Sequence, residues 1–287
     1  LNAAGGETLV NQVTINTQAT TPNGGGNVAM DDSGNYVVAW QDGRSGNNDV
    51  WAAVYHTDGS VKVSEFKVHS NQSSNQEWAN VGIADNGNFA VTWSDNRSGT
   101  YETYMRLYNS AGTAITGETL VSTLSGAQDY SAIDFASDGS FVVTFDNASN
   151  SDIYFQRFNS SGVAQGSNTK ANTYTSSTQV SPEIAVADNG SFVIVWESNG
   201  QDGSGYGVYG QRFNANGTTS GSEFRANTTI SENQWLPSVA AASDGSFVVS
   251  WESSNQDGSG YGIYAQRFDA TAAKLGGEIL VNAFTSG

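Results

Sequence analysis

The chain has 287 residues, of which 37% are hydrophobic and 11% aromatic, and this composition excludes an intrinsically disordered protein. Its 11 Lys and Arg against 28 Asp and Glu give a formal net charge of −17, which excludes a nucleic-acid-binding protein and disfavours an anionic membrane surface as partner. The absence of cysteine removes disulfides and thiolate metal sites, and no apolar run approaches the ~18 residues of a membrane span, so we expect no membrane insertion.

One segment recurs five times along the chain, which indicates a repeat architecture. The copies are VAMDDSGNYVVAW (28–40), VGIADNGNFAVTW (81–93), AIDFASDGSFVVTF (132–145), IAVADNGSFVIVW (184–196) and VAAASDGSFVVSW (239–251). Each contains a marker glycine, and successive marker glycines lie 51 to 55 residues apart. That period is close to the ~50 residues of the longer propeller blades.

Each unit reads as four strands, a to d, with a Gly-containing turn between a and b. In the last unit strand a covers 239–241, strand b 247–251, strand c 261–268 and strand d 278–282. Strands b and c alternate in polarity, and no window has a helical period. Because one such sheet cannot bury both faces, radial packing against its neighbours is expected, with the recurring aromatic residues of strand b between the blades.

The sequence therefore predicts an all-β protein, a five-bladed β-propeller with four antiparallel strands per blade. A single domain spans 1–287, with blades at about 28–75, 80–127, 131–178, 182–233 and 237–284 and with 1–27 as terminal closing strand and lead-in. Strand d appears six times, because GGETLVN (5–11) matches GGEILVN (276–282), whereas strands a to c appear five times. We expect one terminal copy to close the ring, and the surplus copy favours a chain excised from a longer array.

The stretches WESNGQDGSGYGVYGQRF (196–213) and WESSNQDGSGYGIYAQRF (251–268) resemble a repeat of large bacterial RTX-type adhesins and related exported proteins. WQDGRSGNNDVW (40–51) and WSDNRSGTYETY (93–104) resemble its W-x-D-x-R-S-G variant, from which the third unit departs at 145–147. This resemblance implies a secreted or cell-surface protein in calcium-rich surroundings, with neighbouring domains of a longer chain as partners.

The b–c loops concentrate carboxylates on Gly-rich segments, and calcium prefers such oxygen ligands. The candidate metal ligands are Asp42, Asp49, Asp95, Asp146, Asp152, Asp202 and Asp257, with Glu197 and Glu252 in the same loops. The alternative is that these side chains only close turns through local hydrogen bonds. Calcium is the single cofactor considered, and no organic cofactor is expected.

The d–a linkers carry a glutamine followed by bulky residues, and they emerge on the same face as the b–c loops. Trp78, Tyr130 and Trp235 could ring this face and stack on sugar, because glycan sites combine aromatic walls with a few polar groups. The other candidate ligand-binding residues are Gln76, Gln128, Gln234, Arg44 and Arg97. The alternative is that the aromatic rings pack over the blade ends.

A carboxylate pair across a central cleft would be needed for glycoside cleavage, and the weak candidates are Glu77, Asp129 and Glu183. The two histidines, His56 and His69, make a Ser–His triad improbable. The first reading is therefore a secreted carbohydrate-binding or adhesion module, calcium-assisted, with a glycan or cell-surface polysaccharide as partner. The alternatives are a polysaccharide-active enzyme (glycoside hydrolase or lyase) and a structural spacer of a large surface protein.

Overall fold

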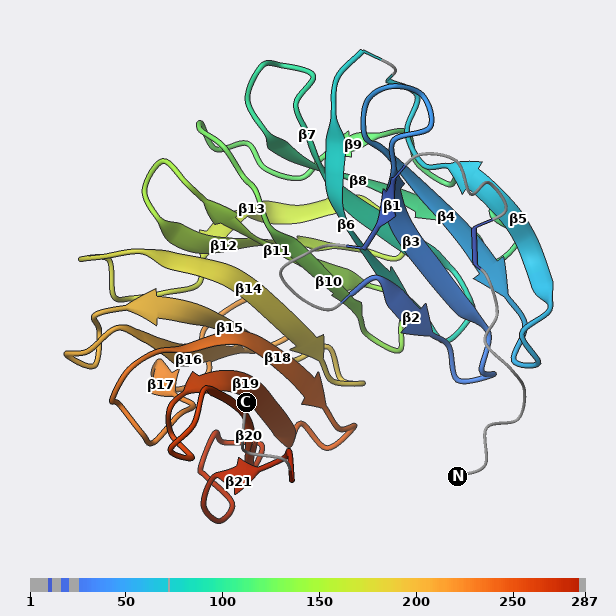
Figure 1. Ribbon diagram of the computed structural model, residues 1–287. Helices are drawn as coiled ribbons and strands as arrows, with labels where there is room; N and C mark the ends of the chain where they lie inside the picture. The colour runs from blue at the N-terminus through green and yellow to red at the C-terminus, as the bar shows by residue number, and fades with distance from the viewer. Residues whose placement is uncertain (1–9, 12–16, 21–25, 72, 284–287) are drawn as a thin grey trace.

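A computed structural model describes residues 10–11, 17–20, 26–71 and 73–283 (Figure 1). Within these residues the chain forms five antiparallel sheets and no helix, and so no segment of them is a helix able to cross a membrane. Four sheets have four strands in chain order, and the first has an additional short strand. The predicted all-β class and the four-stranded antiparallel unit are confirmed.

The strands are as follows. Sheet one contains β1 (Gln18–Ala19), β2 (Val28–Met30), β3 (Tyr36–Asp42), β4 (Asp49–Tyr55) and β5 (Val61–Lys67). Sheet two contains β6 (Gln76–Ile83), β7 (Phe89–Asp95), β8 (Glu102–Tyr108) and β9 (Thr119–Leu120). Sheet three contains β10 (Ser131–Phe135), β11 (Phe141–Asn147), β12 (Asp152–Phe158) and β13 (Ala164–Lys170). Sheet four contains β14 (Gln179–Val186), β15 (Phe192–Asn199), β16 (Tyr206–Phe213) and β17 (Phe224–Arg225). Sheet five contains β18 (Gln234–Ala241), β19 (Phe247–Ser254), β20 (Tyr261–Phe268) and β21 (Ile279–Leu280).

The turn between strands a and b is built around the marker glycine in every sheet. These glycines have φ between 78° and 81°, a conformation that costs glycine little and other residues more. In the first of these turns the amide of Gly34 donates to the carbonyl of Asp31 at 2.9 Å. The sequence expectation of a tight Gly turn is confirmed, and the five turns set the register of the a and b strands.

The hydrophobic core lies between neighbouring sheets. Each of the first four core clusters draws its buried side chains from two consecutive sheets, and Trp93, Trp196 and Trp251 are almost fully buried within them. A stacked aromatic pair also joins strands b and c in all five sheets, as in Phe247 and Phe268, whose ring centroids are 4.8 Å apart. The recurring aromatic residues therefore pack the sheets together, as their spacing predicted.

The first strand of a sheet begins earlier than the sequence indicated. Strands β6, β14 and β18 begin at Gln76, Gln179 and Gln234, three or four residues before the expected blade boundaries. The alternating pattern was obscured because each of these strands contains a β-bulge, which adds one residue and inverts the alternation.

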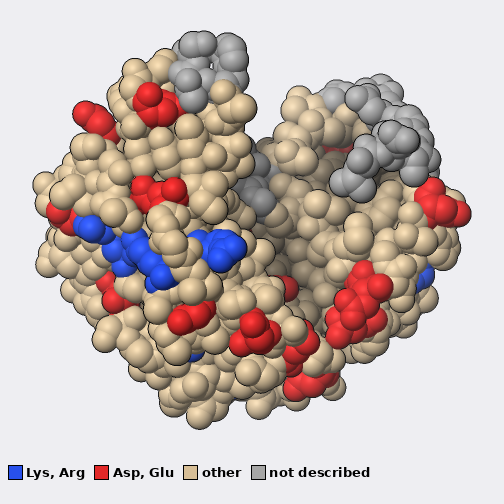
Figure 2. Space-filling view, turned by 90° about the horizontal axis from the view of Figure 1, so that it is seen from below, with Lys and Arg blue, Asp and Glu red and all other residues tan. Residues whose placement is uncertain are grey.

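The first and fifth sheets stand at the two ends of the series. No described strand of one pairs with a described strand of the other. In Figure 1 they lie on either side of an open space, and Figure 2 shows the surface deeply hollowed when the molecule is seen from below. The predicted closure of the ring by a terminal strand falls partly outside the described residues, because 5–9 are among those not described.

Candidate functional site

Three of the a strands carry a bulge at the same point, near the end of the sheet where the b–c loops lie. At these bulges Trp78, Ser181 and Leu236 have φ of 54°, 55° and 49°. Non-glycine residues seldom adopt this left-handed conformation, and where they do, it often re-aims side chains at a functional site. At two of the bulges an aromatic residue contacts a ring of a neighbouring sheet: Trp78 contacts Tyr130, and Trp235, beside Leu236, contacts Tyr206.

Carboxyl groups that follow the aromatic end of strand b accept hydrogen bonds from backbone amides at the loop end, one group from a bulge and one from the linker before β10. Glu197 Oε1 accepts a hydrogen bond of 2.8 Å from the amide of Leu236, in the next sheet. Asp146 Oδ1 accepts from the amides of Asp129 and Tyr130, both at 3.1 Å. Burial raises the pKa of Asp146 to about 6, although these amide hydrogen bonds oppose the rise. Burial likewise raises the pKa of Glu197, which is 6% exposed.

The three expected sugar-stacking aromatic residues divide into two groups. Trp78 packs between Tyr101 and Tyr130, with centroid distances of 5.1 and 5.2 Å. Trp235 packs near Tyr206 at 6.2 Å and Tyr261 at 6.3 Å. The two groups come from different sheets. The structure therefore places two separate aromatic clusters at the loop end, and Trp78, Tyr130 and Trp235 do not form one continuous circle around it.

A pocket of about 510 Å³ opens beside the second aromatic group. It is built from loop ends of sheets three, four and five, and its polar groups include two carboxyl groups. The lining residues are Tyr130, Val180, Ser181, Glu197, Trp235, Leu236, Glu252 and Tyr261. Two of the predicted sugar-stacking residues, Tyr130 and Trp235, therefore share one pocket with Glu197 and Glu252, whereas Trp78 is not among the lining residues.

The glutamines predicted to bind ligand lie at or just before the start of the a strands. Gln76, Gln128 and Gln234 are fully buried. Gln76 Nε2 donates to Ser74 Oγ at 2.9 Å, and Gln234 Nε2 donates to the carbonyl of Ser231 at 3.0 Å. Gln128 donates to the carbonyl of Gly126. These contacts fix the linkers, and none of the three glutamines lines the pocket.

Arg44 ties the b–c loop of sheet one to its strand d, and Arg97 ties that of sheet two to the residue before its strand d. The Arg97 guanidinium bridges Asp95, at 2.5 Å, and Glu118, at 2.6 Å, and it lies 4.2 Å from the ring centroid of Tyr104. Arg44 bridges Asp42 and Glu65 in the same way. Burial alone would raise the pKa of Asp95, but its hydrogen bonds with Arg97 and Trp93 lower that pKa overall. Both arginines are therefore engaged within the protein.

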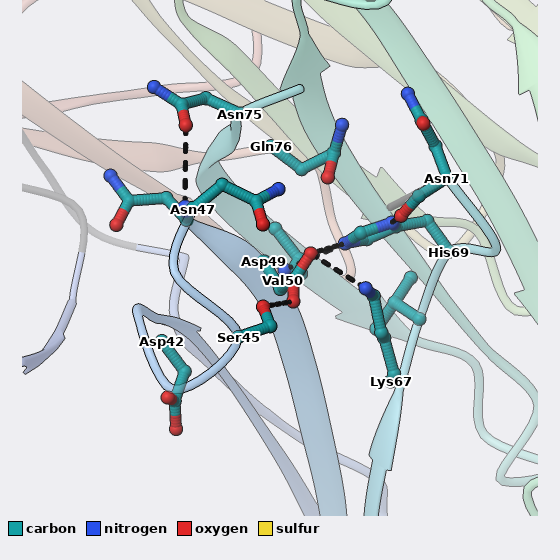
Figure 3. Close-up of polar contacts among 12 residues, drawn as sticks. Asp42, Ser45, Asn47, Asp49, Val50, Lys67, His69, Asn71, Asn75 and Gln76 are labelled. Atoms are coloured by element: carbon teal, nitrogen blue, oxygen red, sulfur yellow. Dashed lines mark hydrogen bonds and ion pairs between the residues drawn. The ribbon is translucent and has the colours of Figure 1, made fainter. Parts of the chain in front are cut away.

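The candidate metal ligand Asp49 faces basic and polar groups in the close-up of Figure 3. Its Oδ1 lies 2.7 Å from Lys67 Nζ and 3.4 Å from His69 Nε2. His69 Nε2 accepts from the amide of Val50 at 3.1 Å, and burial together with Lys67 lowers the pKa of His69 to about 4. His69 is therefore neutral at pH 7, and Lys67 supplies the positive charge beside Asp49.

The other candidate metal ligands are spread over separate loops. Asp152 lies 3.4 Å from Lys170 Nζ, and Asp202 lies 4.0 Å from the guanidinium of Arg225. Asp257 Oδ1 accepts from the amide of Ser259 at 3.1 Å, which closes a turn. Within the described part of the chain, no three Asp, Glu or His side chains are grouped to hold a metal ion. Calcium binding stays a prediction.

The candidate catalytic carboxyl groups lie on the a strands and the linker beside them. Glu77 accepts from Tyr101 Oη at 2.7 Å and from Asn48 Nδ2 at 2.5 Å. Burial raises the pKa of Asp129, and it raises the pKa of Glu183 to about 7. None of the three lines the pocket, whereas Glu197 and Glu252 do. In the sequence, Glu197 and Glu252 are marked by the Trp–Glu dipeptide that units four and five share. From the sequence they were grouped with the candidate metal ligands of the b–c loops and not with the catalytic candidates.

We expect Glu183→Gln to stabilise the protein at pH 8 and to leave stability unchanged near pH 4. The pKa of Glu183 is higher in the folded protein than in the unfolded chain, so ionisation destabilises the fold as the pH rises from about 4.5 to 7. Because the side chain is only half-buried, we expect a gain of about 1 kcal/mol. Melting temperatures of both proteins across this pH range measure the effect, and parallel pH profiles would contradict it.

Comparison with known proteins reveals the fold and no family. No protein-family model matches the chain, and no curated protein matches it. A Dyadobacter fermentans protein of unknown function is 10% identical, with a TM-score of 0.59 over 92% of this chain and 86% of that one. Hydrazine synthase of Kuenenia stuttgartiensis is 10% identical, with a TM-score of 0.59 over 94% of this chain and 70% of that one. An α-L-arabinanase of Penicillium chrysogenum, complexed with arabinobiose, is 12% identical, with a TM-score of 0.54 over 88% and 79%.

The fold is that of a β-propeller. At identities of 10 to 12% these likenesses concern the fold alone, and function must be argued from the site.

Proposed function

We propose that the protein acts on a polysaccharide, which it binds in the pocket between Tyr130 and Trp235 and cleaves there by glycoside hydrolysis. The observation that carries this proposal is the joint presence of aromatic walls and two carboxyl groups in one open pocket. Aromatic faces stack on the apolar faces of sugar rings, and carboxyl groups hydrogen-bond to sugar hydroxyls. The pocket volume of about 510 Å³ accommodates a short segment of a glycan chain.

The two carboxyl groups differ in environment, which favours hydrolysis over binding alone. Glu197 is buried and has a raised pKa, so it suits the general acid that protonates the glycosidic oxygen. Glu252 is more accessible, so it suits the carboxylate that activates a water molecule or attacks the anomeric carbon. The fold shared with an arabinanase supports the same reaction class.

A glycan-binding module without catalysis is the second candidate. It is supported by the contact of Glu197 Oε1 with the amide of Leu236, which gives this carboxyl group a structural role at the bulge. The repeats also resemble those of exported adhesins, and this resemblance supports a secreted or cell-surface protein whose ligand is an extracellular polysaccharide.

We expect Glu197→Gln to reduce the release of reducing ends from a cleaved polysaccharide by at least about 100-fold, because general acid catalysis contributes roughly 10²- to 10⁴-fold. Glu252→Gln should have a similar effect. Glu232→Gln is the matched control, since Glu232 is an exposed glutamate of the d–a linker that precedes β18 and does not line the pocket.

The assay begins with a panel of arabinans, xylans, β-glucans and uronic-acid polymers. Cleavage that both pocket variants lose supports the enzyme. Binding without cleavage, retained by Glu197→Gln, supports the binding module and overturns the hydrolase. Neither binding nor cleavage across the panel would leave the structural spacer as the remaining interpretation.

A further inference from the structure

The backbone carbonyl of Val10 occupies the place of the carbonyl that follows strand d in a preceding sheet. Between sheets one and two, Tyr108 Oη donates to the carbonyl of Val68, the residue that follows β5, at 2.7 Å. The same bond, at 2.7 Å, joins Tyr55 Oη of sheet one to the carbonyl of Val10. Val10 also packs against the cluster that contains Trp40 and Tyr55, the counterparts of Trp93 and Tyr108. Sheet one therefore receives Val10 as sheet two receives Val68.

The contact between Asn11 and Gln18 extends this equivalence. Asn11 Nδ2 donates to Gln18 Oε1 at 3.4 Å. The same pair of residue types, seven residues apart, is joined at 3.1 Å between Asn172 and Gln179 and at 2.8 Å between Asn227 and Gln234. In those two cases the segment is a d–a linker that leaves one four-stranded sheet and enters the next. The contacts of Asn11 and Gln18 match those of such a linker.

Strand d of sheet five is already in place. β21 pairs with β20 through Tyr264 and Leu280. The segment that ends at Asn11 cannot take the same position on β20 unless it displaces β21. Its contacts with sheet one therefore assign it to a sheet other than the five described here.

The face of sheet five that would meet a following sheet is exposed. Val248, Ile263 and Val281 are 37%, 41% and 57% exposed. Their counterparts in sheets one to four are at most 5% exposed, because the next sheet covers them. Counterparts of Val248 are Val37, Ala90, Val142 and Val193; those of Ile263 are Val50, Thr103, Ile153 and Val208; those of Val281 are Val68, Val121, Ala171 and Ala226.

The opposite face of sheet one is exposed in the same way. Val28 and Met30 are 58% and 65% exposed. By contrast, Val81, the counterpart of Val28 in sheet two, is 2% exposed, and Phe135, the counterpart of Met30 in sheet three, is 8% exposed. A unit of this repeat has both kinds of face, one for the sheet before it and one for the sheet after it. It would therefore cover sheet five and sheet one together.

We propose that the space between sheets five and one holds one further four-stranded unit of the same repeat, with Val10 and Asn11 at the place of the residues that follow its strand d. The occupant is a repeat unit with an apolar face, and the full ring has six such units.

The repeat provides a direct way to add this unit. Residues 5–11 and 276–282 are identical at six of seven positions, so residues 228–275 can be spliced in front of Gly5 without altering the junction. We expect the spliced protein to unfold in one transition, with a melting temperature at least about 5 °C higher, because it buries two exposed apolar faces. It should also bind less of a dye that reports exposed apolar surface.

Ile263→Asp makes the test specific. In the 287-residue chain this substitution should move the melting temperature by no more than about 1 °C, because the side chain is exposed. In the spliced protein it should remove most of the gain. If proteases digest the added unit and the spliced protein has the same melting temperature as the 287-residue chain, the proposal is wrong.

Two further outcomes would also overturn it. Closure by five sheets alone predicts that Thr8→Cys and Ala265→Cys form a disulfide in the 287-residue chain, which has no cysteine of its own. Occupation by a second copy of this chain predicts a dimer in solution that Ile263→Asp dissociates. A monomer without the disulfide is the result expected from an open series of five sheets.

Discussion

Replacing Asp95 with alanine should lower the free energy of unfolding by about 3 kcal/mol. Asp95 is fully buried and accepts hydrogen bonds from Trp93 Nε1 at 3.0 Å, from the amide of Arg97 at 2.9 Å and from its guanidinium at 2.5 Å. Removing the carboxylate leaves a buried indole N–H without its acceptor and deprives Arg97 of one of its two partners, and a broken buried ion pair costs about 3–5 kcal/mol. We take the lower value because Arg97 is partly exposed and keeps Glu118.

Chemical denaturation of the wild type and the variant measures this loss. Ser198→Ala is the matched control, because Ser198 holds the same position in sheet four and makes only neutral hydrogen bonds, so its removal should cost about 1 kcal/mol or less. The pKa of Asp95 is lowered in the folded protein, so its contribution is complete above about pH 4 and is lost as the pH falls through the folded-state pKa. If Asp95→Ala lowers the free energy of unfolding by less than about 1 kcal/mol at pH 7, the Asp95–Arg97 contact is not stabilising.

Replacing Trp235 with alanine should weaken glycan binding by about 30-fold, which corresponds to about 2 kcal/mol. Trp235 forms one wall of the pocket and packs near Tyr206 and Tyr261, so its loss removes the largest apolar surface that a sugar ring could contact. Trp235→Phe, which keeps an aromatic face, should retain most of the affinity. Calorimetric titration with the best oligosaccharide of the panel measures the change.

Tyr174→Ala provides the control for this measurement. Tyr174 is a half-buried aromatic residue of the linker after β13, and it does not line the pocket. Its loss should leave affinity unchanged. If Trp235→Ala and Tyr174→Ala weaken glycan binding equally, the effect is a general one on stability and Trp235 does not contact the ligand.

The a strands show where sequence reasoning stops. The Gly turns and the alternating b strands follow from short-range geometry, because antiparallel neighbours are also neighbours along the chain. The bulges at Trp78, Ser181 and Leu236 add one residue and put non-glycine residues at positive φ. Their side chains carry no local signal for that conformation, since it is stabilised by acceptors such as Glu197 from another sheet.

The loop carboxylates show the same limit for the site. Asp42 and Asp95 were assigned to calcium, and the arginines two residues later were assigned to ligand. The structure pairs each aspartate with its arginine. Both readings use the same residue types at the same spacing, so only the positions of the side chains distinguish them.

The amino-acid sequence by itself determined the repeat, the four-stranded unit and the aromatic layers, because each depends on contacts within about 50 residues. Only the tertiary structure decided which residues share a pocket, since Tyr130 and Glu252 come from different sheets and meet through sheet packing. The match between 5–11 and 276–282 was visible in the sequence, but it was compatible with closure of five blades. Only the tertiary structure showed the contact of Val10 with Tyr55 and the exposure of Val281, from which we propose a further unit, because a packed face and an uncovered one differ only in three dimensions.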